Sequence, residues 1–281
     1  MSGPKPEVRG RPAAGAGVEA ATAKGKPGFL DLPERTSKPR ATGVTHVLDP
    51  GVSITALAAS VSVIADYVDI WKLGWGTAYL DPGVAEKVAL LARHDIISCV
   101  GGTLLEIAWA QGKVAEFLEW AADAGFAAVE VSNGVVGMPA AEKRRLIERG
   151  ASRFTILAEV GRKDPQAPVS ATQWRQEMSS DLAAGARWVI AEGRESGTVG
   201  IYSGDGSVRQ SLVRELVEYP VIFEAPRREQ QAWFIRALGS NVSLGNIAIG
   251  DVFSVETLRL GLRADTATLT VPALADAASA P

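Results

Sequence analysis

The sequence of 281 residues contains very little cysteine and histidine, and this scarcity restricts the chemistry open to it. Cys99 is the only cysteine, and His46 and His94 are the only histidines. No internal disulfide can form, and a thiolate zinc cluster is excluded. The two histidines have no partner at metal-ligand spacing, so we interpret His46 as a packed strand residue and Cys99 as inert core. A cytoplasmic location is the default expectation for such a chain.

Long apolar runs and long basic runs are also missing. No apolar stretch approaches the roughly 18 residues that a membrane helix needs. The longest basic block is Lys143–Arg145, and we therefore expect neither membrane nor nucleic acid as a partner. The first residues lack the apolar core of a secretory signal. Neither a G-x-S-x-G nucleophile motif nor a G-x-G-x-x-G after the first strand is present, which disfavours an α/β-hydrolase and a dinucleotide-binding domain.

Hydrophobic residues make up 47% of the chain, enough for a sizeable core, but bulky apolar residues are scarce at its two ends. Residues 1–39 are rich in Pro, Gly, Ala and basic residues, so we expect a disordered tail there. Residues 268–281 have a similar composition and are expected to form a flexible C-terminal tail. The predicted folded unit is a single domain over residues 40–267.

Within this unit, short β-branched runs alternate with longer helical patterns. We expect strands over Val44–Leu48, Tyr67–Leu73, Ile96–Val100, Ala127–Val131, Phe154–Val160, Trp188–Ala191, Val221–Phe223 and Val242–Leu244. Helices are expected over Ile54–Ala65, Gly83–Arg93, Val114–Ala124, Ala140–Glu148, Thr172–Ala184, Ser211–Glu218, Arg228–Leu238 and Val252–Leu262. Eight alternating pairs imply parallel strands joined by crossovers, and they favour a (β/α)8 TIM barrel of the α/β class over an open doubly wound sheet.

Carboxylates gather where the expected strands end. Each of them follows an apolar strand run by at most one residue; they are Glu130, Glu159, Glu192 and Glu224. In a barrel of this kind the ends of all strands meet at one mouth, where the chemistry resides. Four carboxylates pointing into one mouth repel each other unless a cation or basic side chains neutralise them. An oxygen-rich site without thiolates favours Mg²⁺.

Basic side chains and glycine-rich loops accompany these carboxylates. The available basic groups are Lys72, Arg162, Lys163 and Arg194. Glycine-rich stretches at 74–77, 101–103 and 193–197 allow close approach of backbone amides to an anion, although tight turns would also explain them. Trp75, between two of these glycines, could wall the site. Together these groups suit a small polyanion such as a phosphorylated acid.

The strand-end motifs resemble those of the phosphosulfolactate synthase family. The matching stretches are Tyr67–Thr77, Gly101–Glu106, Ala128–Gly134, Ala158–Asp164, Ile190–Gly197, Phe223–Pro226, Gln230–Ile235, Asn241–Ile247 and Glu256–Thr266. They occur in order over about residues 40–266, and the resemblance is highly specific. It implies a (β/α)8 barrel and a lyase that adds sulfite to phosphoenolpyruvate with Mg²⁺. The product is (2R)-phospho-3-sulfolactate, on the route to coenzyme M.

The resemblance also implies roles for individual residues. Lys163 matches the family lysine proposed to protonate carbon 2, with Glu159 and Arg194 as further catalytic residues. The expected substrate contacts are Lys72, Arg162, Gly102, Thr103, Asn133, Gly193, Ser196 and Asn246. The expected Mg²⁺ ligands are Glu130, Glu159, Glu192 and Glu224. A homo-oligomer is expected for such a barrel.

The sequence departs from the family pattern at three points. Pro50 stands where the family usually has a lysine, Asn133 where aspartate is common, and Arg162 where lysine is common. The change at Pro50 removes a basic group from the edge of the site. It therefore affects most the expectation that sulfite, or another second anion, binds there. Two alternatives therefore stay open: a related lyase that adds another nucleophile to a phosphorylated acid, and a non-catalytic, stress-associated homologue.

Overall fold

The structure of the protein, a computed structural model, describes residues 27–161 and 170–274. The compact unit that contains the barrel begins at Pro33. Lys163 and Arg162, two of the expected site residues, lie outside the described residues. None of the described helices is long and apolar enough to span a membrane.

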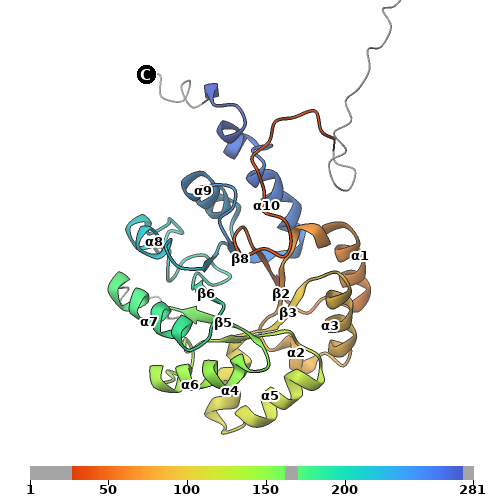
Figure 1. Cartoon of the computed structure of the whole chain (residues 1–281), viewed down its shortest axis with the longest axis vertical. Coiled ribbons are helices and arrows are strands. Elements are labelled where there is room, and N and C mark those ends of the chain that lie inside the picture. Colours follow the sequence, from red (N-terminus) through yellow and green to blue (C-terminus); the bar gives the residue numbers. More distant parts are fainter. Residues whose placement is uncertain (1–26, 162–169, 275–281) are drawn as a thin grey trace, which may run out of the picture. The chain divides into compact units, whose positions relative to one another are not determined.

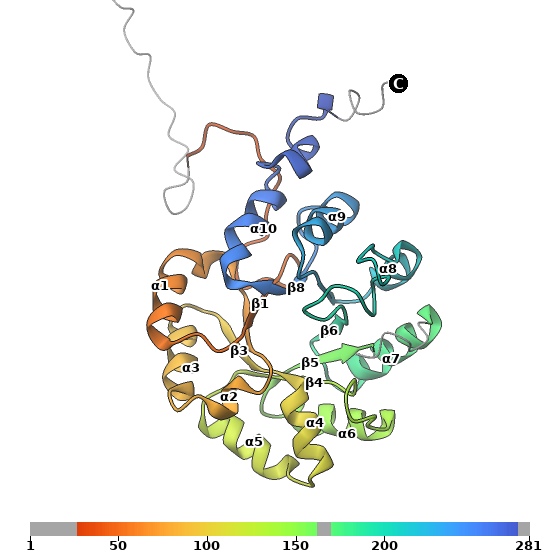
Figure 2. The same cartoon turned by 180° about the vertical axis from the view of Figure 1, so that it is seen from behind.

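Eight parallel strands close into a barrel in sequence order, and β1 pairs with β8 to complete it. Helices surround the strands in both views (Figures 1 and 2). The strands are β1 Thr45–Asp49, β2 Ile70–Leu73, β3 Ile97–Val100, β4 Ala128–Val131, β5 Thr155–Val160, β6 Trp188–Ala191, β7 Val221–Glu224 and β8 Leu244–Ala248. The predicted (β/α)8 barrel is confirmed.

The helices between the strands are more numerous than strict alternation predicts. The α-helices are α1 Ile54–Ile64, α2 Thr77–Leu80, α3 Val84–Arg93, α4 Gly102–Ala110, α5 Val114–Asp123, α6 Ala140–Ala151, α7 Ala171–Ala183, α8 Gln210–Leu216, α9 Arg228–Leu238 and α10 Val252–Arg259. Short 3-10 helices are η1 Ala65–Tyr67, η2 Ile249–Asp251 and η3 Ala264–Leu269. The additional helices α2 and α4 begin directly after glycine-rich turns that were expected to be loops.

Two strands, β2 and β8, differ from the prediction by more than one residue. β2 begins at Ile70 because the preceding residues turn in η1. β8 extends to Ala248 rather than ending at Leu244, so Asn246 lies inside the strand and not in the loop that follows it. Gly245 and Asn246 weaken the β-propensity of this segment, and the register with β1 and β7 overrides that local preference.

The side chains inside the barrel form two kinds of layer. Apolar side chains fill the lower part of the interior; they are Val44, Ile70, Cys99, Ala128, Leu157, Trp188, Ile190 and Ile222. Successive side chains of a strand point to opposite faces, so the residue two positions later points inward again. Lys72, Glu130 and Glu159 occupy those positions on β2, β4 and β5. The alternation of side chains along the strands therefore places charged groups in the layer directly above this apolar layer.

A segment before β1 lies against the amino-terminal ends of several strands. Arg35 Nε is 3.2 Å from Glu256 Oε1, and Arg40 Nη1 is 3.1 Å from Asp69 Oδ1. Trp188, at the start of β6, donates from its indole nitrogen to the carbonyl of Ala41 at 3.2 Å. Ordered contacts thus begin before residue 40, the expected start of the domain. The tails predicted at the two ends stay predictions where they fall outside the described residues.

Candidate active site

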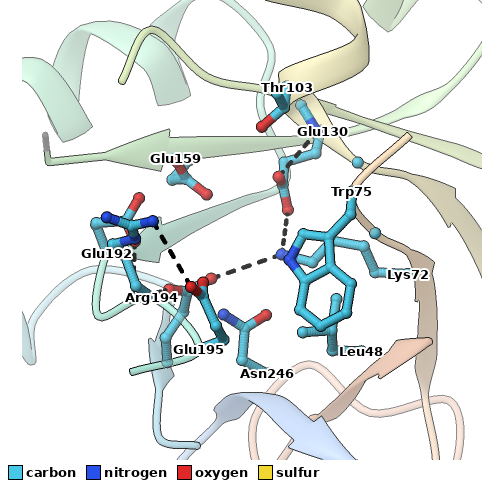
Figure 3. Close-up of a pocket in the computed structure, with 14 residues that line it drawn as sticks. Leu48, Lys72, Trp75, Thr103, Glu130, Glu159, Glu192, Arg194, Glu195 and Asn246 are labelled. Carbon is cyan, nitrogen blue, oxygen red and sulfur yellow. Dashed lines mark hydrogen bonds and ion pairs between the residues drawn. The ribbon is translucent and has the colours of Figure 1, made fainter. Parts of the chain in front are cut away.

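A pocket opens at the carboxyl-terminal ends of the strands, which we call the mouth of the barrel. Figure 3 shows its charged side chains converging from several different strands. The lining residues are Leu48, Lys72, Gly74, Trp75, Gly101, Gly102, Thr103, Glu130, Glu159, Glu192, Arg194, Glu195, Glu224 and Asn246. All four predicted strand-end carboxylates are therefore brought together, as the barrel topology requires.

Lys72 is the internal counter-ion of this pocket. Its ammonium Nζ is 2.9 Å from Glu130 Oε2 and 3.5 Å from Glu224 Oε1, and all three side chains are buried. Burial alone would lower the pKa of Lys72, but the charges of Glu130 and Glu224 outweigh it and raise that pKa above its usual value. The charged form of Lys72 is thus favoured, and it neutralises part of the carboxylate cluster.

Backbone amides complete the surroundings of two carboxylates. The amide of Gly102 donates to Glu130 Oε1 at 2.9 Å, and the amides of Gly193 and Arg194 donate to Glu224 Oε2 at 2.9 Å. A Cβ atom at Gly102 would lie 2.4 Å from the Ser132 hydroxyl oxygen, so only glycine fits there. The amides of Gly102 and Gly193, which were expected to face a bound anion, thus serve the protein's own carboxylates. Burial also raises the pKa of Glu224 above its usual range.

Three lining residues adopt a backbone conformation that disfavours side chains. Trp75, Arg194 and Asn246 have φ values of +53°, +56° and +53°. Among the described residues only Asp95 is a further non-glycine with positive φ. Each such residue costs about 1 kcal/mol or more, and this kind of strain concentrates at functional sites. The amide of Arg194, held by Glu192 Oε1 at 2.8 Å and by Glu224, fixes one of these conformations.

Of the expected substrate contacts, Lys72, Gly102, Thr103 and Asn246 line the pocket. Three others, Gly193, Asn133 and Ser196, do not line it. Asn246 Oδ1 is buried without a hydrogen-bond partner in the described part of the chain. The Asn133 side-chain amide donates to the carbonyl of Met138 at 3.4 Å, and the Ser196 hydroxyl lies 2.9 Å from that of Thr198. Asn133 and Ser196 are thus engaged within their own loops.

The matches to known proteins fall on this architecture. A family model described as (2R)-phospho-3-sulfolactate synthase (ComA) covers residues 33–265. The chain belongs to the (2R)-phospho-3-sulfolactate synthase family. It is 41% identical over 244 residues to a phosphosulfolactate synthase of Bacillus subtilis, covering 84% of this chain and 97% of that protein. It is 40% identical over 244 residues to one of Methanothermobacter thermautotrophicus, covering 83% and 95%.

Solved structures agree at the level of the fold. The 3-keto-L-gulonate-6-phosphate decarboxylase of Vibrio cholerae aligns with a TM-score of 0.52 at 12% identity, over 81% of this chain and 99% of that one. A 3-hexulose-6-phosphate synthase aligns with a TM-score of 0.50 at 16% identity, over 81% and 96%. Identities this low show the shared barrel and nothing about the reaction.

A Mg²⁺ site needs oxygen donors that converge on one point. In residues 27–161 and 170–274, no three or more His, Cys, Asp or Glu side chains are grouped so that they could hold a metal ion by themselves. Lys72 takes the central position between Glu130 and Glu224, whereas Glu159 and Glu192 lie across the pocket from it (Figure 3). Mg²⁺ often binds through one or two carboxylates together with water and substrate oxygens, and Glu159 and Glu192 fit that mode.

The sequence interpretation missed several residues that shape the pocket. Glu195 and Leu48 line it; Leu48 could have been recognised as the inward position that follows His46 by two. Glu106, in contrast, is a buried carboxylate with a structural task. It accepts hydrogen bonds from the Ser132 hydroxyl and from the amides of residues 134–136, so it shapes the loop after β4.

Proposed function

We propose that the protein is a lyase that adds sulfite to phosphoenolpyruvate and forms (2R)-phospho-3-sulfolactate. The match to the family along almost the whole length of a relative supports this proposal most strongly. The chain aligns along nearly the whole length of a named phosphosulfolactate synthase, and its mouth combines a locked Lys72–carboxylate set with the strained Arg194 and Asn246. Strain at these positions is expected where a small charged substrate must be oriented.

The proposed reaction balances without a redox partner. The sulfur lone pair of sulfite attacks the methylene carbon of phosphoenolpyruvate and forms the carbon–sulfur bond. The electron pair of the double bond moves toward the carboxylate and gives an enediolate. A proton then enters at carbon 2, and no group leaves. Catalysis therefore requires stabilisation of charge on the substrate carboxylate and a well-placed acid.

The described residues divide these tasks by position. Arg194, whose side chain is 38% exposed beside Glu195, presents a guanidinium that suits phosphate or sulfonate oxygens. Thr103 lies in the first turn of α4, where the helix dipole favours negative charge. Asn246 offers a side-chain amide from β8. Lys163, outside the described residues, is the proposed proton donor to carbon 2.

Mg²⁺, when bound, would supply positive charge opposite the carboxylate of phosphoenolpyruvate. Glu159 and Glu192 would hold it. Lys72 instead keeps Glu130 and Glu224 from repelling these two carboxylates, because it neutralises the near side of the cluster. We therefore propose two carboxylate ligands for Mg²⁺ instead of four, and the remaining coordination positions are left for water and substrate oxygens.

The test is direct synthesis. The protein is incubated with phosphoenolpyruvate, sulfite and Mg²⁺, and phosphosulfolactate is measured by mass spectrometry. Product is expected in the complete mixture and not without sulfite, and excess EDTA should abolish it. Absence of product over a range of pH and metal ions would sink the proposal.

Calorimetry distinguishes the alternatives if no product forms. Binding of phosphoenolpyruvate without turnover would favour a related lyase that uses another nucleophile, which the loss of a basic group at Pro50 makes worth testing. Absence of any binding would contradict both enzymatic proposals and favour a non-catalytic homologue.

A further inference from the structure

Lys143 is fully buried outside the pocket, yet it contacts the backbone of a pocket residue. It lies on α6, and its ammonium Nζ is 2.7 Å from the backbone carbonyl oxygen of Glu159. The same nitrogen is 2.7 Å from Glu177 Oε1 and 2.7 Å from Asp181 Oδ2, both on α7. The ammonium group thus donates hydrogen bonds to the Glu159 carbonyl and the Glu177 carboxylate, and it forms an ion pair with Asp181.

The end of β5 explains why the carbonyl of Glu159 needs this donor. β4 ends at Val131, whose register partner on β5 is Ala158. Glu159 therefore lies one residue beyond the last rung on the β4 side. On the other side it still pairs with Ile190 of β6. Lys143 supplies a hydrogen bond on the side where the neighbouring strand has ended.

The ion pair by itself does not account for a buried lysine at this position. Two charges taken out of water are costly, and a well-packed apolar pair of similar volume often stabilises a protein at least as well. Apolar side chains could therefore hold α6 against α7. They could not donate to the carbonyl of Glu159. The bond to the strand end is the property that requires an ammonium group here.

We propose that Lys143 is a positioning residue that sets the place of the Glu159 carboxylate in the mouth. The side chain and the carbonyl of Glu159 belong to one residue, so a shift of the carbonyl moves the carboxylate with it. A displacement of about 1 Å in an active-site group can reduce turnover by up to about 10²-fold. The kinetic part of this inference rests on the proposed function, whereas the structural part does not.

The test compares a variant that loses the bond to the Glu159 carbonyl with one that keeps it. Lys143→Met combined with Asp181→Leu removes the buried charges together and also removes the donor to Glu159. Asp181→Asn keeps Lys143 and its bond to the carbonyl. We expect kcat to fall at least tenfold in the double variant, with the KM for phosphoenolpyruvate changed less than threefold. Asp181→Asn should keep kcat within about twofold of the wild type.

Hydrogen–deuterium exchange gives a readout that needs no activity. Amides at the end of β5, residues 158–161, should exchange faster in the double variant and at the wild-type rate in Asp181→Asn. Lys87→Met is the control for loss of a buried lysine, because Lys87 pairs with Asp81 next to α3 and has no hydrogen bond to a pocket residue within the described parts of the chain. It should lower stability without changing kcat or exchange in β5.

Each outcome decides the inference. Wild-type kcat and exchange in the double variant, or equal losses in both Asp181 variants, would overturn it. If wild-type protein makes no phosphosulfolactate, the proposed function fails and exchange alone decides about Lys143. If the double variant does not fold, Lys143→Gln with Asp181→Asn replaces it. Glutamine is too short to reach the carbonyl of Glu159, so the same losses are expected.

Discussion

The two ends of the barrel both contain buried charges, but with opposite excess. Among the described residues that line the mouth, five carboxylates face two basic groups, Lys72 and Arg194. Among the most buried charged side chains of the described residues at the amino-terminal end, the excess is basic, because Arg35, Arg40 and Arg259 outnumber Glu256 and Asp69. The surplus cation there is Arg259, which is completely buried and donates to backbone carbonyls. Its acceptors are the carbonyls of Ser240, Val242 and Val44.

The difference separates stability from chemistry. At the amino-terminal end, backbone carbonyl oxygens accept hydrogen bonds from both terminal nitrogens of the surplus Arg259, so the protein itself provides partners for that charge. At the mouth the surplus is negative and borders an open pocket, so a cation or a charged substrate has a place to act. Backbone strain is concentrated at the mouth, because Trp75, Arg194 and Asn246 line it and only Asp95, before β3, is a further non-glycine residue with positive φ among the described residues. Changes at the mouth should alter turnover, and changes at the other end should alter stability alone.

Removal of the internal counter-ion should have the largest effect. In Lys72→Met, Glu130 and Glu224 lose their shared cation and face each other in a buried site. We expect kcat/KM to fall about 10³-fold and stability at pH 8 to fall by about 3 kcal/mol. Enzyme assays and urea denaturation measure the two effects.

The pH dependence of this variant provides its own control. Without Lys72 the pKa of the two buried carboxyls should rise above the unfolded value, so the folded state binds protons that the unfolded state does not. The stability deficit should then shrink as pH falls from 8 toward 5. A deficit that is constant with pH would mean that lost packing, and not charge, explains the variant.

His46 lies in β1 between the two ends and should govern part of the acid sensitivity. It is completely buried, neither ring nitrogen has a hydrogen-bond partner among residues of known placement, and burial together with the charge of Lys72 lowers its pKa from 6.5 to about 3. Below pH 6.5 the unfolded state therefore binds a proton that the folded state refuses. Stability is present above this pH and is lost as pH falls.

The loss attributable to His46 should reach about 3 kcal/mol by pH 4. Denaturant unfolding of the wild type and of His46→Leu at pH 7 and pH 4 measures it, because carboxyl contributions are common to both proteins. The variant should lose about 3 kcal/mol less over this interval. Parallel losses in the two proteins would show that His46 is not held neutral by the fold.

The amino-terminal end of the barrel contains a comparable buried ion pair, Arg40–Asp69, that takes no part in the proposed reaction. Arg40→Met removes the partner of Asp69, which keeps its hydrogen bond from the amide of Thr45 at 2.9 Å. We expect a loss of about 2 kcal/mol in the free energy of unfolding. The kcat of the folded enzyme should stay at the wild-type value. A tenfold fall in kcat at full occupancy of the folded state would break the separation between the two ends.

The same contrast explains what could be predicted from the sequence. The sequence was enough to predict the barrel and the convergence of four carboxylates, Glu130, Glu159, Glu192 and Glu224. Both follow from the number of strands and from the alternation of side chains along each strand, which can be read from short stretches of sequence. The partners of Lys72 could not be predicted locally, because β2, β4 and β7 are not neighbours and their side chains meet only across the interior of the closed barrel. Loop positions were predicted least well. Asn133 follows a strand end closely, but the hydrogen bonds of its own loop decide where its side chain points.

Pro50 allows the smallest and most specific change at the edge of the mouth. It is exposed and follows Asp49, whose carboxylate accepts from the amides of Gly51 and Val52 at 2.7 and 2.8 Å. These bonds hold the turn without the proline ring, so Pro50→Lys should fold normally. The added charge lies at the rim, where solvent screens it, and is worth about 0.3–1 kcal/mol. The KM for the more weakly bound anion should therefore fall about two- to fivefold at low ionic strength.

The gain should disappear near 0.5 M salt, where the screening length is only a few ångströms. Pro50→Gln removes the ring without adding charge, and it should leave KM unchanged at every salt concentration. A gain shared by both variants would assign the effect to the backbone of the turn. No gain in either would confine anion recognition to the interior of the mouth, among Arg194, Asn246 and the residues around them. In that case the absence of a lysine at position 50 has no bearing on which nucleophile the enzyme accepts.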